Sequence, residues 1–512
     1  MPMTSSDIGI MISIIIYMAA MLGIGMYFAK KNENVGDYYL GGRKLGPFVT
    51  AMSAEASDMS SWLLMGLPGV AYLTGVADAA WTAIGLAAGT YINWLFVARR
   101  IRTYSNNINA ITIPDFFSKR YHDDKNVLNF IAAVIIIIFF IPYTASGFAA
   151  CGKLFSSLFG ADYFWSMIIS AIVIVGYTSL GGFMAASTTD LIQSIVMTIA
   201  LIVVLTFGIE TAGGWDAVAA NARELPGYIS LNSSYDPSSG TSSGYGFITK
   251  ISTMAWGLGY FGMPHILLRF MAIEDRQKLK LSRRVATIWV IISLTIAIII
   301  GIVGYAMSQA GAMDVLVGSN SETIIVRVAG LLSKDGFAAA LLAGVILAGI
   351  LAATMSTADS QLLAASSSVS QNIFRDFLKI NISEKTAMRL ARVTVLSIAV
   401  IAGIFASNPN SSVFQIVSFA WAGFGATFGP VMLLALFWKH STKNGAIAGM
   451  ITGAAMIFIW KYMIRPLGGA WDIYELLPAF LLALAVNVLV SKACKPDPDL
   501  EKEYDEYQEA LK

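Results

Sequence analysis

The sequence predicts an all-α integral membrane protein, and three observations support this fold class. Of the 512 residues, 56% are hydrophobic and only 13% are charged, whereas soluble domains carry roughly 25% charged residues. Apolar windows long enough to cross a bilayer, about 20 residues each, recur along the whole chain. Basic residues gather in alternate connections between these windows. The net charge of +2 is close to neutral, so we do not expect a nucleic-acid partner.

Thirteen windows are long and apolar enough to be membrane spans. They cover about residues 7–29, 47–70, 76–98, 127–151, 162–181, 190–211, 250–270, 285–308, 336–367, 391–407, 413–437, 442–463 and 472–491. The first apolar run is too long for a signal-peptide core and lacks a preceding basic region, so we expect it to be retained as a span. Cys151 and Cys494 fall far apart in this arrangement, so no disulfide is expected.

The placement of Lys and Arg predicts the orientation of the spans. Most of these residues follow odd-numbered windows: Lys30, Lys31, Arg43, Lys44, Arg99, Arg100, Arg102, Lys119, Arg120, Lys125, Arg276, Lys278, Lys280, Arg283, Arg284, Arg375, Lys379, Lys385, Arg389, Arg392, Lys439 and Lys443. Few follow even-numbered windows: Lys153, Arg223, Lys250, Arg327, Lys334, Lys461 and Arg465. Because cytoplasmic connections are rich in basic residues, the N-terminus is predicted outside and the C-terminus in the cytoplasm. This orientation requires an odd number of spans.

The second window contains the most unusual stretch, residues 53–69 (SAEASDMSSWLLMGLPG), with Glu55 and Asp58 among small polar residues. A carboxylate at the bilayer centre costs at least ~2.5–3.5 kcal/mol, so it must face a protein interior, a water-filled cavity or a cation. A small polar run also suits a broken helix, whose freed carbonyls need partners other than lipid. We therefore expect this segment to unwind and to hold a cation and a small solute.

The seventh window contains residues 255–265 (AWGLGYFGMPH), in which three glycines and a proline fall within nine residues. These residues weaken a helix and permit close approach of a ligand to the backbone. Trp256 and Tyr260 share one face at helical spacing and suit an apolar ring or a cationic amine. The alternative is small-residue helix packing beside an interfacial aromatic residue.

The ninth window contains Ser356, Thr357 and Asp359. Hydroxyls, carbonyls and carboxylates are the ligands of hard cations. The alternative is that Ser356 and Thr357 only hydrogen-bond to their own helix, but a charge at Asp359 requires a partner at that depth.

Two further charged residues lie at span ends, and each has two interpretations. Asp190 begins the sixth window, where an acid also suits a helix N-terminus. Arg43 precedes the second window, where it also fits ordinary positive-inside charge. From the residues alone both interpretations stay open.

The second and seventh windows are five spans apart, so spans 2–6 and 7–11 each begin with an interrupted helix. Paired broken segments predict a midplane site in an inverted-repeat transporter of five plus five spans. The expected domains are a first span with its inner connection (1–46), a transport core (47–438, made of 47–211 and 250–438), two further spans (439–491) and a solvated cytoplasmic tail (492–512). The polar connection 212–249 is expected to be a mobile surface loop.

Several motifs together resemble the sodium/solute symporter family, and within it the sodium/proline symporters. They are residues 40–47 (LGGRKLGP), 57–62 (SDMSSW), 176–183 (GYTSLGGF), 256–265 (WGLGYFGMPH), 355–357 (MST), 421–426 (WAGFGA) and the pattern Lys439, Gly445, Ala446, Gly449. The resemblance runs from about residue 35 to 465.

The resemblance implies a sodium site between spans 2 and 9. Its members would be the carbonyls of Ala56, Met59 and Ala353, the hydroxyls of Ser356 and Thr357, and Asp58, which acts directly or through its field. Proline would lie against aromatic and small residues, namely Trp62, Tyr143, Trp256, Tyr260 and Pro264, with Ser60 nearby. Arg43, Asp190 and Asp359 are assigned to coupling and ion passage. Glu55 and Asp359 stand where relatives can carry small or neutral residues, and they either alter ion affinity or are neutralised by local pairs.

The resemblance also implies the function: sodium-coupled inward symport of L-proline by alternating access, across a cell membrane. Sodium is the co-transported ion, and no obligatory protein partner is evident. One alternative is a symporter of the same family for another small solute. Another is a transporter-like membrane sensor, although the chain carries no appended kinase or receiver domain. An enzyme is not expected, because the sequence lacks a His/acid cluster, a nucleophile motif and a phosphate loop.

Overall fold

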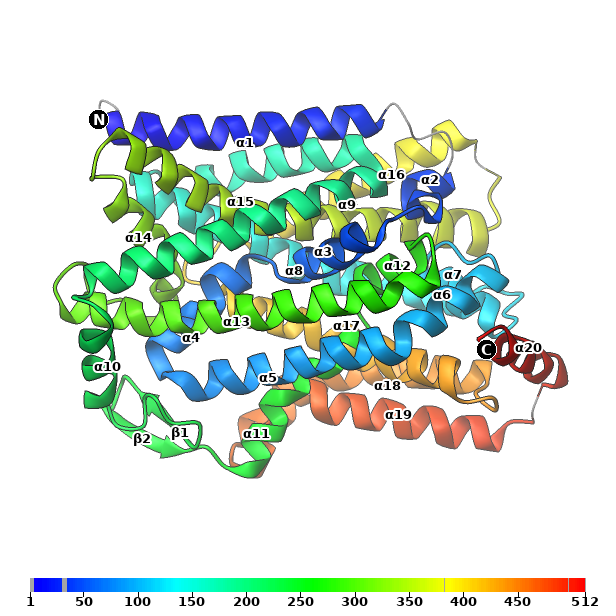
Figure 1. The fold of residues 1–512 in the computed structure, drawn as a ribbon. Coiled ribbons are helices and arrows are strands. Elements are labelled where there is room, and N and C mark those ends of the chain that lie inside the picture. Colours follow the sequence, from blue (N-terminus) through cyan, green and yellow to red (C-terminus); the bar gives the residue numbers. More distant parts are fainter. Residues whose placement is uncertain (1–3, 30–34, 382, 496, 512) are drawn as a thin grey trace.

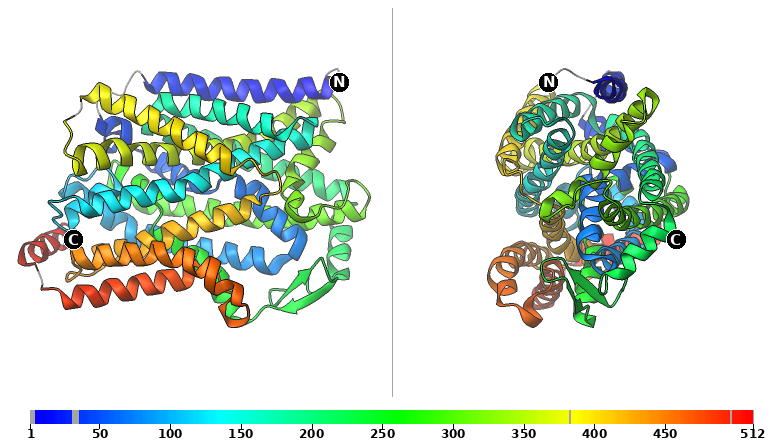
Figure 2. Two further views of the ribbon diagram at one scale, coloured as in Figure 1. Left: turned by 180° about the vertical axis from the view of Figure 1, so that it is seen from behind. Right: turned by 90° about the vertical axis from the view of Figure 1, so that its left-hand side faces the viewer.

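The computed structural model describes residues 4–29, 35–381, 383–495 and 497–511. Its long helices lie side by side in one bundle, as Figures 1 and 2 show. The hairpin of β1 (Ser233–Asp236) and β2 (Thr241–Gly244) marks one end of the bundle together with α10 (Trp215–Glu224), and this end is called the hairpin end. The opposite end carries α20 (Pro498–Ala510) and is called the tail end. The N-terminus lies at the hairpin end and the C-terminus at the tail end (Figure 1), as an odd number of spans requires. Lys30 and Lys31 lie outside the described residues.

The all-α membrane fold is confirmed. Within the described residues, ten helical stretches are long and apolar enough to cross a membrane. They coincide with α1 (Ser5–Ala29), α5 (Val76–Ile92) continued into α6 (Ala98–Asn107), α8 (Val127–Phe159), the second part of α9 (Tyr163–Thr211), α13 (Leu279–Gln309), α15 (Phe337–Ser367), α16 (Glu384–Phe405), α17 (Val413–Phe437), α18 (Lys443–Ile459) and α19 (Leu476–Ala493).

The three remaining predicted windows are the second, fifth and seventh. The second window forms two helices, α3 (Pro47–Asp58) and α4 (Leu67–Thr74). The seventh forms α11 (Phe247–Met254), a 3₁₀ turn (Ala255–Phe261) and α12 (Pro264–Ala272). The fifth is the first part of α9, which kinks at Gly182, where φ is 69° and ψ is −172°. All thirteen windows therefore fall on helices, and the two predicted interruptions are present. The five-plus-five inverted repeat stays a prediction.

The peripheral helices lie on opposite edges of the bundle. Figures 1 and 2 show α1 at one edge and α18 with α19 at the other. α1 packs against α9 and α15, whereas α18 and α19 pack against each other and against α17. The helices between them, with α15 and α9 in extensive contact, hold the buried polar residues. Short helices cover the connections: α2 (Val35–Leu40), α7 (Ile113–Arg120) and α14 (Ile324–Leu332). Cys151 and Cys494 are both free thiols, as predicted.

The connection 212–249 contains regular structure, which corrects the expectation of a mobile loop. It forms α10 and the hairpin of β1 (Ser233–Asp236) and β2 (Thr241–Gly244). Tyr228 holds this connection against the end of α4. Its ring is buried, and its hydroxyl donates to the Tyr72 carbonyl at 2.7 Å. The Val76 N–H donates to the Tyr228 carbonyl at 2.7 Å. Gly75 has φ 81°, and a Cβ there would lie 2.1 Å from that carbonyl oxygen, so only glycine fits.

The tail is docked on the tail end of the bundle, so the expectation of a solvated tail is wrong. Tyr507 of α20 stacks on Tyr104 of α6, with ring centroids 4.3 Å apart. The hydroxyls of Tyr504 and Tyr507 donate to the Leu436 carbonyl at 3.2 and 3.3 Å. Polar residues on the helix also contact the neighbouring connections. Lys439 pairs with Asp505 at 2.6 Å, and ring nitrogens of His440 and His122 lie within hydrogen-bonding distance of Glu501 and Glu503, at 2.6 and 2.8 Å. Aromatic burial on one face and polar contacts along the helix hold it in place.

Candidate functional site

The interruption between α3 and α4 is confined to Met59 and Ser60. The helix continues through Asp58, so the predicted unwinding of residues 53–69 is too broad. Met59 leaves helical geometry with φ −74° and ψ 65°. The Ser60 N–H donates to the Asp58 carbonyl at 2.7 Å, so the Ala56 carbonyl loses its helical donor. A π turn, Trp62–Gly66, then leads into α4. The break is short, but it frees backbone carbonyls inside the bundle.

The freed Ala56 carbonyl faces α15. Ser356 Oγ donates to it at 2.8 Å, across 300 residues of chain. The Ala353 carbonyl lies 3.1 Å from both Ser356 Oγ and Thr357 Oγ1. These contacts bring four predicted sodium ligands together, and Met59 lies in the adjoining break. The hydroxyls of Ser356 and Thr357 both hydrogen-bond to their own helix, which was one interpretation of the sequence. Ser356 also contacts α3, as the other interpretation, a site shared between helices, requires.

Asp58 is buried at the end of α3 and is contacted from several helices. Its carboxylate Oδ2 accepts a hydrogen bond from Tyr260 Oη at 2.5 Å. Its carbonyl accepts from Trp62 Nε1 and from Tyr143 Oη, each at 3.2 Å. The second carboxylate oxygen, Oδ1, receives no hydrogen bond from any residue that the structure describes. A buried carboxylate oxygen without a donor is the arrangement in which a cation is stabilising.

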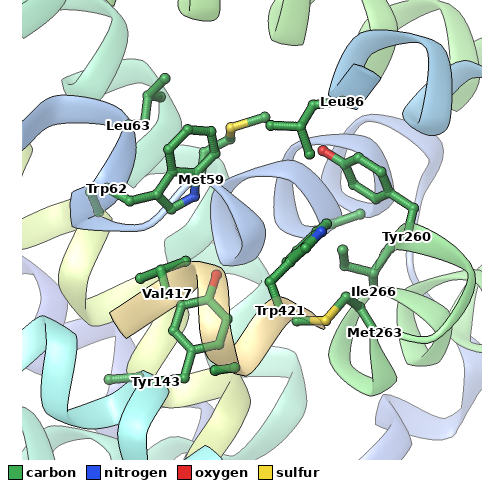
Figure 3. Close-up of a cluster of buried hydrophobic side chains, with 14 of the residues drawn as sticks. Met59, Trp62, Leu63, Leu86, Tyr143, Tyr260, Met263, Ile266, Val417 and Trp421 are labelled. Atoms are coloured by element: carbon green, nitrogen blue, oxygen red, sulfur yellow. The ribbon is translucent and has the colours of Figure 1, made fainter. Parts of the chain in front are cut away.

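Aromatic side chains surround the break, as Figure 3 shows for Trp62, Tyr143, Tyr260 and Trp421. The rings of Trp62 and Trp256 are tilted, with centroids 5.8 Å apart. Trp421 meets Tyr260 edge to face at 5.1 Å and donates from Nε1 to the Trp256 carbonyl at 2.7 Å. These residues come from the π turn before α4, from α8 and α17, and from the 3₁₀ turn, so the cluster closes around both broken helices.

Glycine makes the approach of α17 possible. A Cβ at Gly259 would lie 1.9 Å from Trp421 Nε1, which no side chain allows. Ser60 and Pro264, the other two predicted proline contacts, lie at the two breaks. Ser60 Oγ accepts from the Trp62 N–H at 3.4 Å, and buried Pro264 is the first residue of α12.

Asp190 belongs to a buried ion pair that the sequence did not reveal. Its Oδ2 lies 3.2 Å from an Arg269 guanidinium nitrogen and accepts from Ser53 Oγ at 2.6 Å. Arg269 also donates to Ser360 Oγ at 2.5 Å, and Ser360 Oγ donates to the Ser356 carbonyl at 2.9 Å. Asp190 is thus connected to the Ser356 region of α15 through Arg269.

No role was assigned to Arg269 from the sequence, although it is the buried partner of Asp190. A signal was available. Arg269 follows a broken segment and stands inside the apolar run of α12, where a cation demands a buried partner.

Arg43 lies apart from the break. The Arg43 guanidinium donates to the carbonyls of Met271, Ser105 and Ala110 at 2.7, 3.0 and 2.6 Å. Burial lowers the pKa of Arg43 to about 10, which leaves it charged at pH 7. Its partners lie on α6, α12 and the α6–α7 connection, so Arg43 joins these elements at the tail end.

Glu55 and Asp359 have local hydrogen-bonding partners. Glu55 Oε1 accepts from Trp94 Nε1 at 2.8 Å. Asp359 accepts from the hydroxyl of Thr178 on α9. Glu55 Oε2, like Asp58 Oδ1, receives no hydrogen bond from the residues that the structure describes. The contact with Trp94 therefore accounts for one of its two oxygens, and both interpretations of Glu55 stay open.

A cavity of about 800 Å³ opens beside the aromatic cluster. Its walls come from α4, α5, α11, α17 and the α18–α19 connection, and Trp256 and Phe414 line it. Trp256 also contacts Trp62, which is buried. Because Asp78 in its wall accepts hydrogen bonds from Tyr245 and Ser234 beside the hairpin, the cavity leads to the cluster from the hairpin end.

Comparisons with known proteins point to one family. A family model, that of the sodium:solute symporter family, matches residues 38–453, a range that includes both broken helices. The osmoregulated proline transporter OpuE of Bacillus subtilis is 42% identical over 494 residues, which cover 96% of each chain. A sodium/proline symporter of Staphylococcus aureus (strain USA300) is 40% identical over 492 residues, which cover 94% of this chain and 92% of the relative.

Solved structures give the same fold. A substrate-bound, outward-open Na⁺-coupled sialic acid symporter superposes with a TM-score of 0.77 at 16% identity, covering 95% of this chain and 98% of that chain. Mhp1, a nucleobase-cation-symport-1 transporter, superposes with a TM-score of 0.52 at 13% identity, covering 92% and 98%. At these identities the likeness is one of fold alone.

Proposed function

The chain belongs to the sodium:solute symporter family, and on this premise we propose that it couples inward sodium movement to the uptake of L-proline. The two relatives above are named for proline transport, and one of them for sodium coupling. The observation that carries the proposal is the break at Met59 and Ser60, where carbonyls of α3 meet hydroxyls of α15 beside a cluster of aromatic rings.

The proposed sodium site consists of the carbonyls of Ala56, Met59 and Ala353 with the hydroxyls of Ser356 and Thr357. Sodium is a hard cation that prefers such oxygen ligands. The short contacts among Ala56, Ala353, Ser356 and Thr357 support this set. Asp58 supplies the negative charge, and its unbonded oxygen Oδ1 supports a position near the ion.

The proposed proline site lies against the aromatic cluster. Its members are Ser60, Trp62, Tyr143, Trp256, Tyr260 and Pro264. Trp62 and Tyr143 donate to the Asp58 carbonyl, and Tyr260 donates to the Asp58 carboxylate. The pyrrolidine ring suits the indole and phenol faces. The proline carboxylate suits a half-helix N-terminus.

These shared contacts provide a physical route for coupling. Sodium bound between α3 and α15 orders the break, and the aromatic donors that surround proline are bonded to the same residue, Asp58. Ordering by the first ligand reduces the entropy that the second must lose, which is positive cooperativity. Each sodium ion entering with the membrane potential contributes about 2.3 kcal/mol per 100 mV.

The orientation and domain organisation are parts of the same proposal. The positive-inside pattern puts the tail end in the cytoplasm and the hairpin end outside the plasma membrane. Residues 47–438 form the alternating-access core, and residues 1–46 and 439–491 flank it. Arg43, Asp190 and Asp359 act in coupling and ion passage, with Arg269 as the partner of Asp190. No catalytic step is assigned, because family and relatives are transporters.

The second candidate is a symporter of the same family for another small solute. The aromatic cluster has few hydrogen-bonding side chains, which disfavours a sugar and leaves other amino acids open. A sensor that keeps the transporter fold is a less supported alternative.

Uptake into proteoliposomes tests the proposal. Purified wild-type protein should accumulate labelled proline only under an inward sodium gradient. Asp58→Asn should remove most of that stimulation, whereas Glu55→Gln, a matched buried acid, should leave most of it. Wild-type proline uptake that is equal with and without a sodium gradient would contradict sodium coupling. Competition by unlabelled amino acids in the same assay identifies the substrate.

A further inference from the structure

A groove of about 860 Å³ runs between the first part of α9 and α16. Figure 2 shows α16, in yellow, on the side of the bundle that points away from the viewer in Figure 1. The hydroxyl of Tyr163 donates to the Ala406 carbonyl at 2.7 Å, which joins the two helices at the hairpin end. The groove shares no residue with the proposed sodium and proline sites, and its volume lies within the range of small-molecule sites.

The walls of the groove are apolar side chains that point away from the bundle. Ile172 of α9 and Val400 and Ile404 of α16 line it and are 66%, 65% and 68% exposed. Both helices are apolar along this stretch, α16 over Lys385–Phe405 and α9 over Tyr163–Gly176. The groove therefore faces the hydrocarbon of the bilayer rather than water.

Two glycines keep the groove open. Gly176 of α9 and Gly403 of α16 both line it, and a Cβ at either position would lie in open space among the described residues. A long apolar chain therefore fits between the helices without displacing a side chain.

One charged side chain, that of Arg392, lines the groove on its tail-end side. Arg392 is exposed and makes no ion pair with any residue that the structure describes. Arg389 and Lys385 precede it at helical spacing on the same face of α16, and both are exposed. A lipid-facing cation inside a span requires an anionic partner, and a guanidinium suits the oxygens of a phosphate.

The direction of α16 places this charge correctly for a lipid headgroup. α16 begins toward the tail end (Figure 2), and long side chains on a helix point toward its N-terminus. The Arg392 side chain can therefore extend toward the membrane surface while its stem contacts the apolar wall. From Arg392 to Ile404 the helix rises about 18 Å at 1.5 Å per residue, a length similar to one leaflet, which is half of the ~30 Å hydrocarbon core.

We propose that this groove is a binding site for an anionic phospholipid of the cytoplasmic leaflet. The lipid phosphate binds the Arg392 guanidinium, Arg389 and Lys385 add positive charge nearer the membrane surface, and one acyl chain lies between α9 and α16. The leaflet follows from the proposed orientation, whereas the lipid site itself does not depend on the transported solute. Because α16 also packs against α8 and α15, the bound lipid stabilises the packing of these helices.

Native mass spectrometry of the full-length, delipidated chain in detergent tests the headgroup contact. The wild type should retain one dioleoyl phosphatidylglycerol more tightly than dioleoyl phosphatidylcholine. Arg392→Gln should weaken phosphatidylglycerol binding about fivefold, because one basic contact is lost, and should leave phosphatidylcholine binding unchanged. Arg284→Gln removes an exposed arginine of α13, which packs against α3, α4 and α5, and should bind both lipids as the wild type does.

A second variant tests the apolar part of the site. Gly403→Phe fills the groove and should weaken the binding of both lipids at least fivefold, with Gly176→Leu on the opposite wall as the alternative if Gly403→Phe fails to fold. Phosphatidylglycerol should raise the thermal unfolding midpoint of the wild type, since it binds the folded state, but not that of Gly403→Phe. Inorganic phosphate should neither raise the midpoint nor displace the lipid.

The contrary results are equally specific. Equal affinities of the wild type for the two lipids, or an unchanged phosphatidylglycerol affinity in Arg392→Gln, would overturn the headgroup contact. Unchanged binding in the groove-filling variant would overturn the location. Protection by inorganic phosphate alone would assign the charge to a soluble anion, and wild-type dimers that dissociate in Gly403→Phe would assign the groove to a second copy of the chain. Sodium-dependent proline uptake is measured separately, so the proposed function does not depend on these results.

Discussion

Asp58 is the residue at which the proposed sodium and proline sites meet. Its carboxylate accepts from Tyr260, and its carbonyl accepts from Trp62 and Tyr143. The two ligands are therefore linked through different atoms of one residue. The carboxylate carries the charge that the ion needs, whereas the carbonyl sets where the aromatic donors lie.

This division predicts different effects for two matched tyrosines. Tyr260→Phe removes a hydrogen bond to a charged group, worth ~1.5–3 kcal/mol, and should shift the sodium concentration for half-maximal uptake at least tenfold. Tyr143→Phe removes a hydrogen bond to a backbone carbonyl and should raise the KM for proline with little change in sodium affinity. Sodium titrations of proline uptake measure both. Equal sodium shifts in the two variants would contradict the division.

The Asp190–Arg269 pair predicts a stability effect of single and double changes. Removing one partner leaves a buried charge alone and destabilises by about 3–5 kcal/mol. Asp190→Asn and Arg269→Gln should therefore each lower the thermal unfolding midpoint, and the double variant should recover part of the loss. Unfolding of the purified protein followed by tryptophan fluorescence checks this. A double variant at the sum of the single losses would show that the residues act independently.

At the scale of single residues, the sequence identified the buried acids but not the residues that contact them. Asp58, Asp190 and Glu55 stand out because a carboxylate in an apolar window is costly. Arg269 was overlooked since it is near a span end, where basic residues are common. The bonds from Tyr143 and Trp62 to the Asp58 carbonyl arise only from tertiary packing, so no local pattern could have predicted them.

At the scale of elements, the break between α3 and α4 is narrower than its composition suggests. The run of Ala, Ser and Glu before Asp58 remains helical, because these residues tolerate a helix when buried against other helices. The interruption begins only at Met59, where the Ser60 N–H turns to the Asp58 carbonyl. Composition predicted the existence of the break, and tertiary hydrogen bonds determine its position.

The docked tail helix α20 predicts protease resistance. Lys502 has a side chain 78% exposed, yet cleavage after it requires the helix to unfold locally. Replacing Tyr504 and Tyr507 together with Ala removes the buried face and should speed tryptic cleavage at least tenfold. Glu509→Gln, an exposed change on the same helix, is the control.

The tryptic fragments, followed by mass spectrometry, report the rate. Cleavage of the double variant at the wild-type rate would show that the two tyrosines do not hold the helix.

The docking of α20 was missed from the sequence because its aromatic residues are few and its acids resemble those of a solvated tail. Their partners lie far away in the chain, on α6, α17 and the α17–α18 connection.

For the whole molecule, hydropathy and charge predicted most of the architecture. Each of the thirteen windows falls on a helix, and the termini lie at opposite ends of the bundle (Figure 1). Hydropathy could not show that α9 joins two windows with only a kink at Gly182. It also could not show the hairpin, whose order depends on the burial of Tyr228 against α4 and α5.

The proposed orientation predicts which ends react from outside the cell. In a chain carrying Cys151→Ala and Cys494→Ser, Ser239→Cys in the hairpin turn should react with a membrane-impermeant maleimide in intact cells. Lys502→Cys in the tail helix should react only after the cells are opened. A permeant maleimide that labels both positions is the control. The reverse pattern would invert the orientation.

The central claim is that α3 and α15 hold sodium together at the break, and sodium binding without proline tests it most directly. Radioactive sodium should bind the purified wild-type protein saturably, and Ser356→Ala should weaken that binding at least tenfold, since it removes a hydroxyl ligand and the contact with Ala56. Ser366→Ala removes a buried hydroxyl of the same helix, which donates to the Leu363 carbonyl of its own helix, and should bind as the wild type does. Sodium binding in Ser356→Ala equal to that of the wild type would contradict the joint site.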